Sequence, residues 1–158
     1  MILDKELQFS ASQAVTASAV GTNVVDLTVD RSIGNGEPMG VLFTVGVAAD
    51  QTTGDEDYTF DVEYASNATQ TTGRQLIGRR VYESGTPTAP AQDADLLVPG
   101  YQFVIPIPPT RLSESERYIG IRYVTAGTTP TITVSAFLVP MTTVNASLVL
   151  YPNNYTVA

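Results

Sequence analysis

The chain contains no cysteine, no histidine and no tryptophan. Without imidazole and thiol groups it cannot form a Ser-His-Asp triad, a Cys-His pair or a structural zinc site. The absence of cysteine also excludes a disulfide framework and fits a protein made in a reducing cytosol. Only chemistry based on carboxylates remains open. We therefore predict a protein that is not an enzyme and that has no cofactor, metal site or catalytic residues.

Positive charge is scarce. Eight lysines and arginines stand against sixteen aspartates and glutamates, giving a net charge of −8. Such a chain repels a phosphate backbone, so we expect no nucleic-acid partner. Long apolar runs are also missing: no segment approaches the roughly 18 apolar residues of a membrane span. Charged residues at positions 4–6 stand where a signal peptide needs an apolar run. We expect no membrane partner and synthesis in the cytoplasm.

The residues that are abundant favour β-structure, with threonine, valine and tyrosine in runs that alternate apolar and polar positions. In the clearest run, from residue 57 to 65, the apolar face carries Tyr58, Phe60, Val62 and Tyr64. We predict eight strands, near residues 7–10, 23–29, 40–48, 57–65, 75–83, 101–107, 117–125 and 131–139. Eight strands at this spacing in one domain predict an all-β fold, an antiparallel sandwich of two sheets.

Several of the connections between the predicted strands contain proline. Residues 84–99 form a long proline-rich connection, of a length that is more often functional or mobile than idle. Pro106, Pro108 and Pro109 interrupt a strand-like run, which places residues 101–107 at a sheet edge, where a missing N–H donor is tolerated. Residues 113–116 have the pattern of a single helical turn.

Acidic residues gather between positions 50 and 63. Asp55 and Asp57, together with loop carbonyls, have the oxygen chemistry for calcium, but the twelve-residue calcium-loop pattern is absent. A glycosidase would need two carboxylates across a cleft, which the sequence gives no means of pairing. We favour a solvated acidic face, with Asp61 and Glu63 pointing outward from a strand.

Arginines concentrate at positions 74, 79 and 80. Since Arg79 and Arg80 are adjacent on a predicted strand, their side chains face opposite sides. Two interpretations remain open. The arginines pair with Asp61 or Glu63 across the sheet, or they anchor carboxylates of a partner.

Several short pieces of the chain carry a family resemblance through their order and spacing. They are residues 1–4, 7–10, 23–27 and 33–36, with weaker similarity at 116–119 and 134–138. In this order they resemble the jelly-roll cement, or staple, proteins that decorate the outside of tailed-bacteriophage heads. The resemblance implies a jelly roll over residues 1–139 and a virion protein on the outer head surface. It also implies that the protein bridges neighbouring capsomers against internal DNA pressure.

The partners implied are the phage major capsid protein and the protein itself, as a homo-oligomer, with a dimer preferred over a trimer because isologous dimers are commonest. Residues 140–158 fall outside the resemblance and have the apolar content of an interaction arm. The candidate residues for contact with the capsid or with another copy are Leu3, Phe9, Arg79, Arg80, Tyr101, Leu148, Tyr151 and Tyr155. The alternative function is a carbohydrate-binding sandwich of a tail fibre or adhesin, with a shelf built from Tyr82, Tyr101 and Tyr118.

Overall fold

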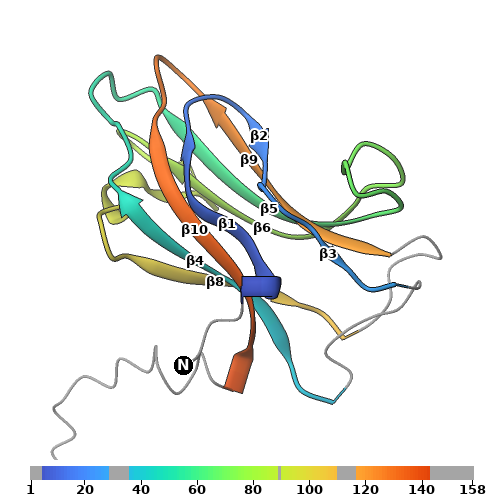
Figure 1. Ribbon diagram of the computed structural model, residues 1–158. Helices are drawn as coiled ribbons and strands as arrows, with labels where there is room; N and C mark the ends of the chain where they lie inside the picture. Colours follow the sequence, from blue (N-terminus) through green and yellow to red (C-terminus); the bar gives the residue numbers. More distant parts are fainter. Residues whose placement is uncertain (1–4, 29–35, 89, 110–116, 143–158) are drawn as a thin grey trace, which may run out of the picture.

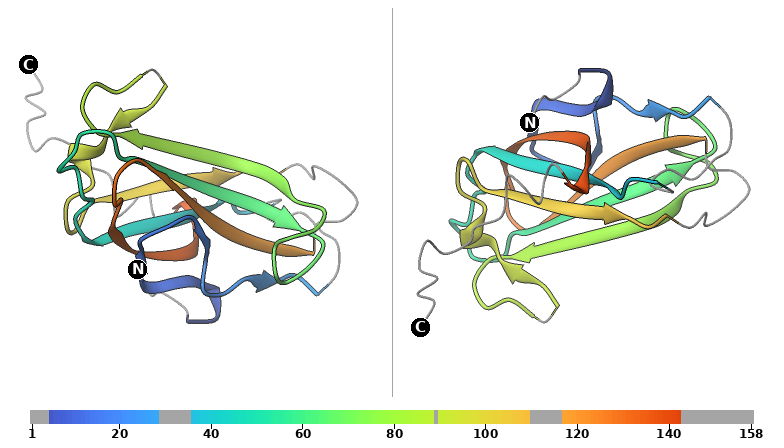
Figure 2. Two further views of the ribbon diagram at one scale, coloured as in Figure 1. Left: turned by 90° about the horizontal axis from the view of Figure 1, so that it is seen from above. Right: turned by 90° about the horizontal axis from the view of Figure 1, so that it is seen from below.

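The computed structural model describes residues 5–28, 36–88, 90–109 and 117–142. They form two β-sheets packed face to face (Figure 1), and the two layers are seen from above and below in Figure 2. The predicted all-β sandwich of two sheets is confirmed. Among the described residues the helical content is limited to two three-residue 3-10 helices, η1 (Lys5–Leu7) and η2 (Ala94–Leu96), and a turn at 141–142.

The first sheet has four strands in the order β1-β10-β4-β8, namely β1 (Gln8–Val15), β10 (Ile132–Pro140), β4 (Met39–Val47) and β8 (Gln102–Ile107). The second has the order β2-β9-β5-β6-β7, with β3 also paired to β9. Its strands are β2 (Ala19–Val20), β9 (Tyr118–Ala126), β5 (Asp57–Ala65), β6 (Gln75–Glu83), β7 (Gln92–Asp93) and β3 (Val25–Asp26). Only β6 and β7 pair in parallel; the other pairs are antiparallel.

The order of pairing is that of a jelly roll. The first half of the chain pairs with the second half as one long antiparallel ribbon: β1 with β10, β2 and β3 with β9, β4 with β8, and β5 with β6. Rolling the ribbon up brings β10 beside β4 and β9 beside β5, which creates the two sheets. Consecutive strands thereby alternate between the layers, apart from the pairs β2 and β3, β5 and β6, and β6 and β7, which lie in the second sheet.

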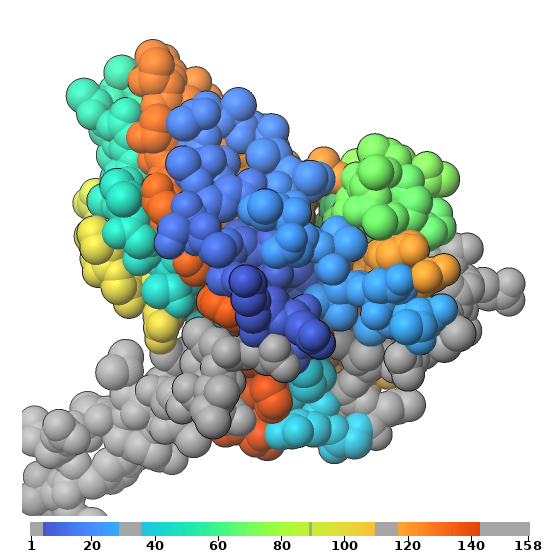
Figure 3. Space-filling model, in the orientation of Figure 1, coloured from blue at the N-terminus to red at the C-terminus, as the bar shows by residue number. Residues whose placement is uncertain are grey.

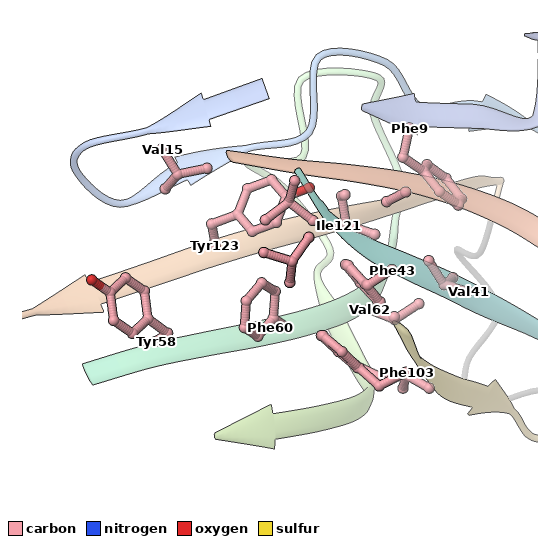
Figure 4. Packing of buried hydrophobic residues seen from close by; sticks show 14 of the residues in the cluster. Phe9, Val15, Val41, Phe43, Tyr58, Phe60, Val62, Phe103, Ile121 and Tyr123 are labelled. Atoms are coloured by element: carbon pink, nitrogen blue, oxygen red, sulfur yellow. The ribbon is translucent and has the colours of Figure 1, made fainter. Parts of the chain in front are cut away.

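Aromatic rings fill the space between the sheets (Figure 4). Phe43 of β4 stacks on Phe103 of β8, with ring centroids 5.0 Å apart. Phe60 of β5 meets Phe103 and Tyr123 edge to face, at 5.0 and 5.8 Å. Each such pair adds about 0.5–1.5 kcal/mol beyond the burial of its apolar area. The predicted inner face of residues 57–65 is confirmed, because Tyr58, Phe60, Val62 and Tyr64 are all buried.

The N-terminal strands differ from their predicted bounds. Strand β1 continues to Val15, beyond the predicted 7–10, through register irregularities on either side of Ser10. Residue Ser12 has a φ of 48°, and this irregular backbone breaks the alternation on which the prediction relied. Of the strand predicted at 23–29, the described structure has only β3 (Val25–Asp26), and the short strand β2 (Ala19–Val20) before it was not predicted. Between them Gly21 packs against Ile121, and the Asn23 N–H bonds to Phe9 O of β1 rather than to β9.

The edge position predicted for residues 101–107 is confirmed, since β8 is the last strand of its sheet. The 84–99 connection contains more structure than predicted. It includes β7 and η2, and it contributes Ala94 and Leu97 to the core. The helical turn predicted at 113–116 lies outside the described residues. No helix in the described part of the chain is long and apolar enough to cross a membrane.

Candidate interaction surfaces

Four of the sequence pieces that carry the family resemblance meet on one side of the sandwich. We call this region the β1–β3 surface, made of residues 7–10, 23–27, 117–119 and 134–138. Gln8 of β1 lies opposite Phe137 of β10, and Val25 of β3 lies opposite Ile119 of β9. In Figure 3 the N-terminal residues of this region, in blue, cover the face beside β9 and β10. Pieces far apart in the chain thus form one continuous region.

Hydrogen bonds fix the geometry of the β1–β3 surface. The Asn23 backbone N–H donates to Phe9 O at 2.9 Å, and Asn23 Nδ2 donates to Gln8 O at 3.2 Å. Arg117 Nε and Nη2 bind the two carboxylate oxygens of Asp26, each at 2.8 Å. The Arg117 hydrogen bond, helped by the Thr28 N–H, lowers the pKa of Asp26 to about 2. The carboxylate therefore stays charged through the physiological range.

An open hollow of about 830 Å³ lies on this side of the molecule, lined by Lys5, Glu6, Gln8, Asn23 and Val24. Its lining mixes both signs of charge with amide and apolar groups, and the Asn23 side chain is anchored there to the backbone oxygen of Gln8 in β1. This composition suits a contact with another protein surface better than a catalytic site.

A second, apolar hollow of about 540 Å³ lies at the ends of β4, β8 and β10. Its lining includes Met39, Ile77, Pro106, Pro108, Met141 and Thr142. The Met141 N–H donates to Pro38 O at 2.7 Å, and Thr142 Oγ1 donates to the Glu37 carboxylate. Residues 141 and 142 are thus held against the sandwich, at the point where the described part of the chain ends.

The arginines of the β5–β6 region mostly pair with acids across the sheet. Arg79 Nε and Nη2 bind the Asp61 carboxylate at 2.7 and 2.8 Å. Glu63 accepts from Arg74 at 2.5 and 3.0 Å and from Arg122 Nε at 3.2 Å. These contacts confirm the predicted pairing of arginines with Asp61 and Glu63.

The predicted solvated acidic face is wrong for these carboxylates. Asp61 and Glu63 point away from the core, as predicted, yet they are only 2% and 3% exposed because arginine side chains cover them. Gln70, from the β5–β6 connection, adds to the cover, and its backbone oxygen accepts from Arg122 Nη2 at 2.9 Å. Burial alone would raise the pKa of Glu63, but the hydrogen bond from Arg74 and the charges of Arg122 and Arg74 outweigh it, so that pKa is lowered.

Arg80 differs from its neighbours on β6. Its register partner is Phe60, so its side chain faces the inner side of the sheet, whereas Arg79 opposite Asp61 faces outward. The predicted opposite directions are therefore confirmed. Arg80 is partly buried and has no ion pair among the described residues. It lines a hollow of about 360 Å³ with Arg79, Val81, Pro90 and Gln92.

The acidic loop at residues 50–57 uses its carboxylates to hold the turn. Asp55 accepts from Thr53 Oγ1 at 2.6 Å and from Thr128 Oγ1 at 3.0 Å. Glu56 is completely buried and accepts from the backbone N–H groups of residues 53, 54 and 55. In the parts of the chain that the structure describes, no three acidic side chains lie close enough to hold a metal ion.

The three tyrosines proposed as a sugar-binding shelf do not form one. Tyr82 is fully buried, with its ring 6.3 Å from that of Tyr101. Tyr118 lies opposite Ala65, whereas Tyr82 lies opposite Tyr58 at the other end of β5. The Arg117 guanidinium covers the Tyr118 ring at 5.0 Å. A flat, exposed aromatic platform is therefore absent at these positions.

The predicted contact residues lie in different environments. Phe9 is fully buried in the core, so it is not available to a partner, which corrects its prediction as a contact residue. Tyr101 is partly buried and packs against the core, and Arg79 is neutralised by Asp61. Leu3, Leu148, Tyr151 and Tyr155 lie outside the described residues. Sequence reasoning missed Asn23, Asp26 and Arg117, whose proximity depends on the pairing of β3 with β9.

Comparison with protein families gives one match. The family model described as Bbp16 matches residues 9–139, which is most of the chain. The chain belongs to the Bbp16 family. No curated protein matches it.

The Bbp16 match begins in β1 and ends in β10, so it includes every strand of the sandwich. Arg79, Arg80 and Tyr101 lie within it, as does the arginine-acid cluster. The match leaves out residues 140–158, the segment that the sequence assigned to a separate tail.

Proposed function

We propose that this protein binds the outer surface of a tailed-phage head and cements neighbouring capsomers against the pressure of the packaged DNA. The observation that carries the proposal is the convergence of the resembling sequence pieces. Residues 7–10, 23–27, 117–119 and 134–138 are scattered along the chain, yet they adjoin through β1–β10 and β3–β9 pairing and through the bond from Asn23 to Phe9. Among the described residues, these resembling pieces therefore adjoin in one region, which supports the proposal.

The fold supplies the mechanical property that the proposed role needs. Aromatic rings pack between the two sheets, and each strand is held by hydrogen bonds to its neighbours in the sheet. The sandwich is therefore rigid. A rigid body loses little conformational freedom on binding, so more of its contact energy is available to hold capsomers together. A ligand that binds only the assembled shell stabilises that shell by its binding free energy, summed over many copies.

The proposed partners are the major capsid protein and a second copy of the chain. We favour a dimer on a two-fold axis, because isologous pairs are the commonest closed assemblies. Two copies related by a two-fold axis would present two β1–β3 surfaces to neighbouring capsomers, which is the geometry that bridging requires. The virion is then the site of action, after synthesis in the cytoplasm of the bacterial host.

The proposal is tested with heads assembled in the presence and absence of the protein. We expect heads without it to release DNA at a lower temperature, or under weaker osmotic support, than complete heads. Adding the purified protein back should restore the release temperature of complete heads. Equal release curves for the two kinds of head would contradict the proposed function.

A matched pair of variants locates the binding surface in the same system. Val24→Trp places a bulky ring in the hollow of the β1–β3 surface, and we expect it to weaken co-sedimentation with heads about tenfold or more, as loss of a central contact does. Val47→Trp is the control, because Val47 is 59% exposed and pairs at the Thr133 end of β10, away from Gln8. Both variants should keep the melting temperature of the wild type. Specific binding in a glycan array, without binding to heads, would favour the carbohydrate-binding alternative.

A further inference from the structure

Strand β6 has an open backbone edge along most of its length. Of its nine residues, only Tyr82 and Glu83 have register partners on β7 within the described structure. Residues 75, 76 and 78–81 pair with β5 alone, and Ile77 lies at a register shift without a register partner. Figure 2 shows β6 along the border of its sheet, with the short β7 segment beside one end. A strand edge with free N–H and C=O groups is a template for the addition of another strand.

The hollow beside Arg80 lies at this edge. Its lining includes the consecutive residues Arg79, Arg80 and Val81. Consecutive strand residues alternate between the two faces of a sheet, so a hollow that touches all three opens at the strand's edge rather than on one face. Pro90 and Gln92 line the opposite side, and Gln92 is the first residue of β7 and pairs with Tyr82. An added strand would therefore run along β6 in line with β7.

The charges along this edge indicate which residue type an added strand would contain. Four described arginines, at positions 74, 79, 117 and 122, have carboxylate partners within 3.2 Å. Arg80 has none among the described residues, although it is partly buried in a protein of net charge −8. A partly buried guanidinium binds a carboxylate strongly because its planar fork matches both oxygens. The uncompensated charge of Arg80 therefore favours an acidic ligand.

Two apolar residues, Leu76 and Val81, lie on the outer side of the same edge, on either side of the ion-paired Arg79. Leu76 is 48% exposed, and Val81 is partly buried. Residues 78–81 alternate between the two faces, and the register shift at Ile77 interrupts this alternation before Leu76. In an extended peptide placed beside residues 78–81, a carboxylate would point to the inner side at Arg80, and a neighbouring apolar side chain would cover Val81 on the outer side.

We propose that the edge of β6 over residues 75–81 binds an extended acidic segment of a partner protein as an added strand, with an aspartate or glutamate of that segment on Arg80. Backbone hydrogen bonds along the edge supply affinity, and the Arg80 ion pair supplies the choice of sequence. This surface lies at the far edge of the second sheet from β2 and β3, so it is separate from the β1–β3 surface. The proposal does not require the partner to be a phage capsid protein.

The test is selection from a random library of seven-residue peptides displayed on yeast, with the full-length protein as the target. We expect the wild type to enrich peptides that carry aspartate or glutamate at one fixed position between apolar residues. Arg80→Gln should lose that preference and bind the enriched peptides at least about tenfold more weakly, the effect expected for loss of a charge-assisted hydrogen bond. Arg122→Gln removes the same charge from β9, away from the edge, and should keep the preference.

Amide hydrogen exchange on the wild type gives a second readout that needs no variant. The enriched acidic peptide should protect residues 75–81, and the same peptide with glutamine and asparagine in place of its acids should protect them much less. The inference is overturned by an enriched set without acids, by equal selection with Arg80→Gln, by no enrichment at all, or by protection elsewhere. If the protein binds heads but enriches no peptide, only this inference is contradicted. If it enriches acidic peptides but does not stabilise heads, only the proposed function is contradicted.

Discussion

Glu63 shows how a carboxylate can face outward from a sheet and still be withdrawn from solvent. It is 3% exposed beneath Arg74 and Arg122, from the start of β6 and from β9. Breaking such a pair from one side leaves buried charge without its partner, which costs more than the pair contributes when intact. Glu63 is therefore a residue on which the stability of the second sheet depends.

We expect Glu63→Gln to reduce the free energy of unfolding by about 1–3 kcal/mol at pH 7, the range for loss of a hydrogen bond to a charged group. The pKa of Glu63 is lower in the folded protein than its ordinary value of 4.5. The folded state therefore binds this proton less readily than the unfolded state. The contribution of Glu63 to stability is present above pH 4.5 and is lost as the pH falls through the lowered pKa.

Urea unfolding of wild type and Glu63→Gln between pH 3 and pH 7 checks this expectation. The two curves should differ at neutral pH and draw together in acid. Asp26→Asn is the control, because Asp26 and Arg117 form a pair that is exposed on both sides, at 40% and 44%. Its effect should be smaller, since solvent screens exposed pairs. An unchanged gap between wild type and Glu63→Gln at low pH would count against the assigned role.

The sequence predicted part of this residue-scale chemistry. Adjacent positions on a strand face opposite sides, and that rule correctly separated Arg79 from Arg80. It did not predict how deeply Glu63 is buried, because part of its cover comes from Arg122 on β9, which also binds the backbone oxygen of Gln70 in a loop. The fold as a whole determines which strand lies beside β5, and this neighbour cannot be predicted from a local sequence pattern.

At the scale of elements, the turn between β9 and β10 is fixed against the loop between β4 and β5. Gly127 has a φ of +91°, and a Cβ at this position would lie 2.2 Å from Asp55 O. Thr128 adds two hydrogen bonds to the Asp55 carboxylate. The close approach of the two backbones requires glycine both for its conformation and for its lack of a side chain.

We expect Gly127→Ala to destabilise the protein by about 2–4 kcal/mol, because it adds a steric clash with backbone to the strain of a positive φ. Gly54→Ala separates the two contributions. Gly54 also has a positive φ, +71°, but nothing lies within 4 Å of its Cβ position. Its cost should be about 1 kcal/mol, the conformational term alone. Thermal unfolding of the two variants measures the difference, and equal losses would show that the Asp55 contact can relax.

Most strands were predictable because their inner faces repeat with a period of two, as in β5 and β10. The exceptions have local causes. The register irregularities of β1 break its alternation, and the pairing of the next segment with β9 is interrupted at Asn23, whose N–H bonds to Phe9 O of β1. Strand β7 was not predicted because its two residues, Gln92 and Asp93, have no alternation of apolar and polar residues. They form a strand only because the fold places them beside Tyr82 and Glu83 of β6.

At the scale of the whole molecule, the contacts of the sandwich continue past the residue at which the family match ends. Strand β10 ends at Pro140, and Met141 and Thr142 still contact Pro38 and Glu37. The family match ends at residue 139. The arm predicted at 140–158 therefore begins with three residues that belong to the sandwich, Pro140, Met141 and Thr142, and its remaining residues, 143–158, lie outside the described structure.

We expect deletion of residues 143–158 to leave the melting temperature within about 2 °C of the full-length value while weakening oligomerisation or head binding, because the deletion removes none of the described packing. Deletion of 141–158 should melt lower, since it also removes the Met141 and Thr142 contacts. Differential scanning calorimetry and sedimentation separate these effects. If the shorter deletion already melts several degrees lower or becomes insoluble, the tail belongs to the core and the arm is excluded.

The two-layer architecture followed from strand count and spacing, whereas the jelly-roll order came from the family resemblance. Alternation shows that a strand has an inner face but not which strand lies next to it. The β1–β3 surface and the open edge of β6 both depend on that neighbour relation. This is why Arg80 could be named from the sequence as a candidate, while its position at a strand edge could not.

The ribbon pairing also sets an order of assembly during synthesis. Strands β5 and β6 are neighbours in the chain and form the innermost hairpin, but Gln8 of β1 must wait for Phe137 of β10. Pairings between distant residues form late, because the chain entropy of closing a long loop is lost before the contacts compensate for it. A nascent chain therefore makes the β6 edge early and the β1–β3 surface last. A chain that stops before β10 would display the site for an added strand without the surface proposed to bind heads.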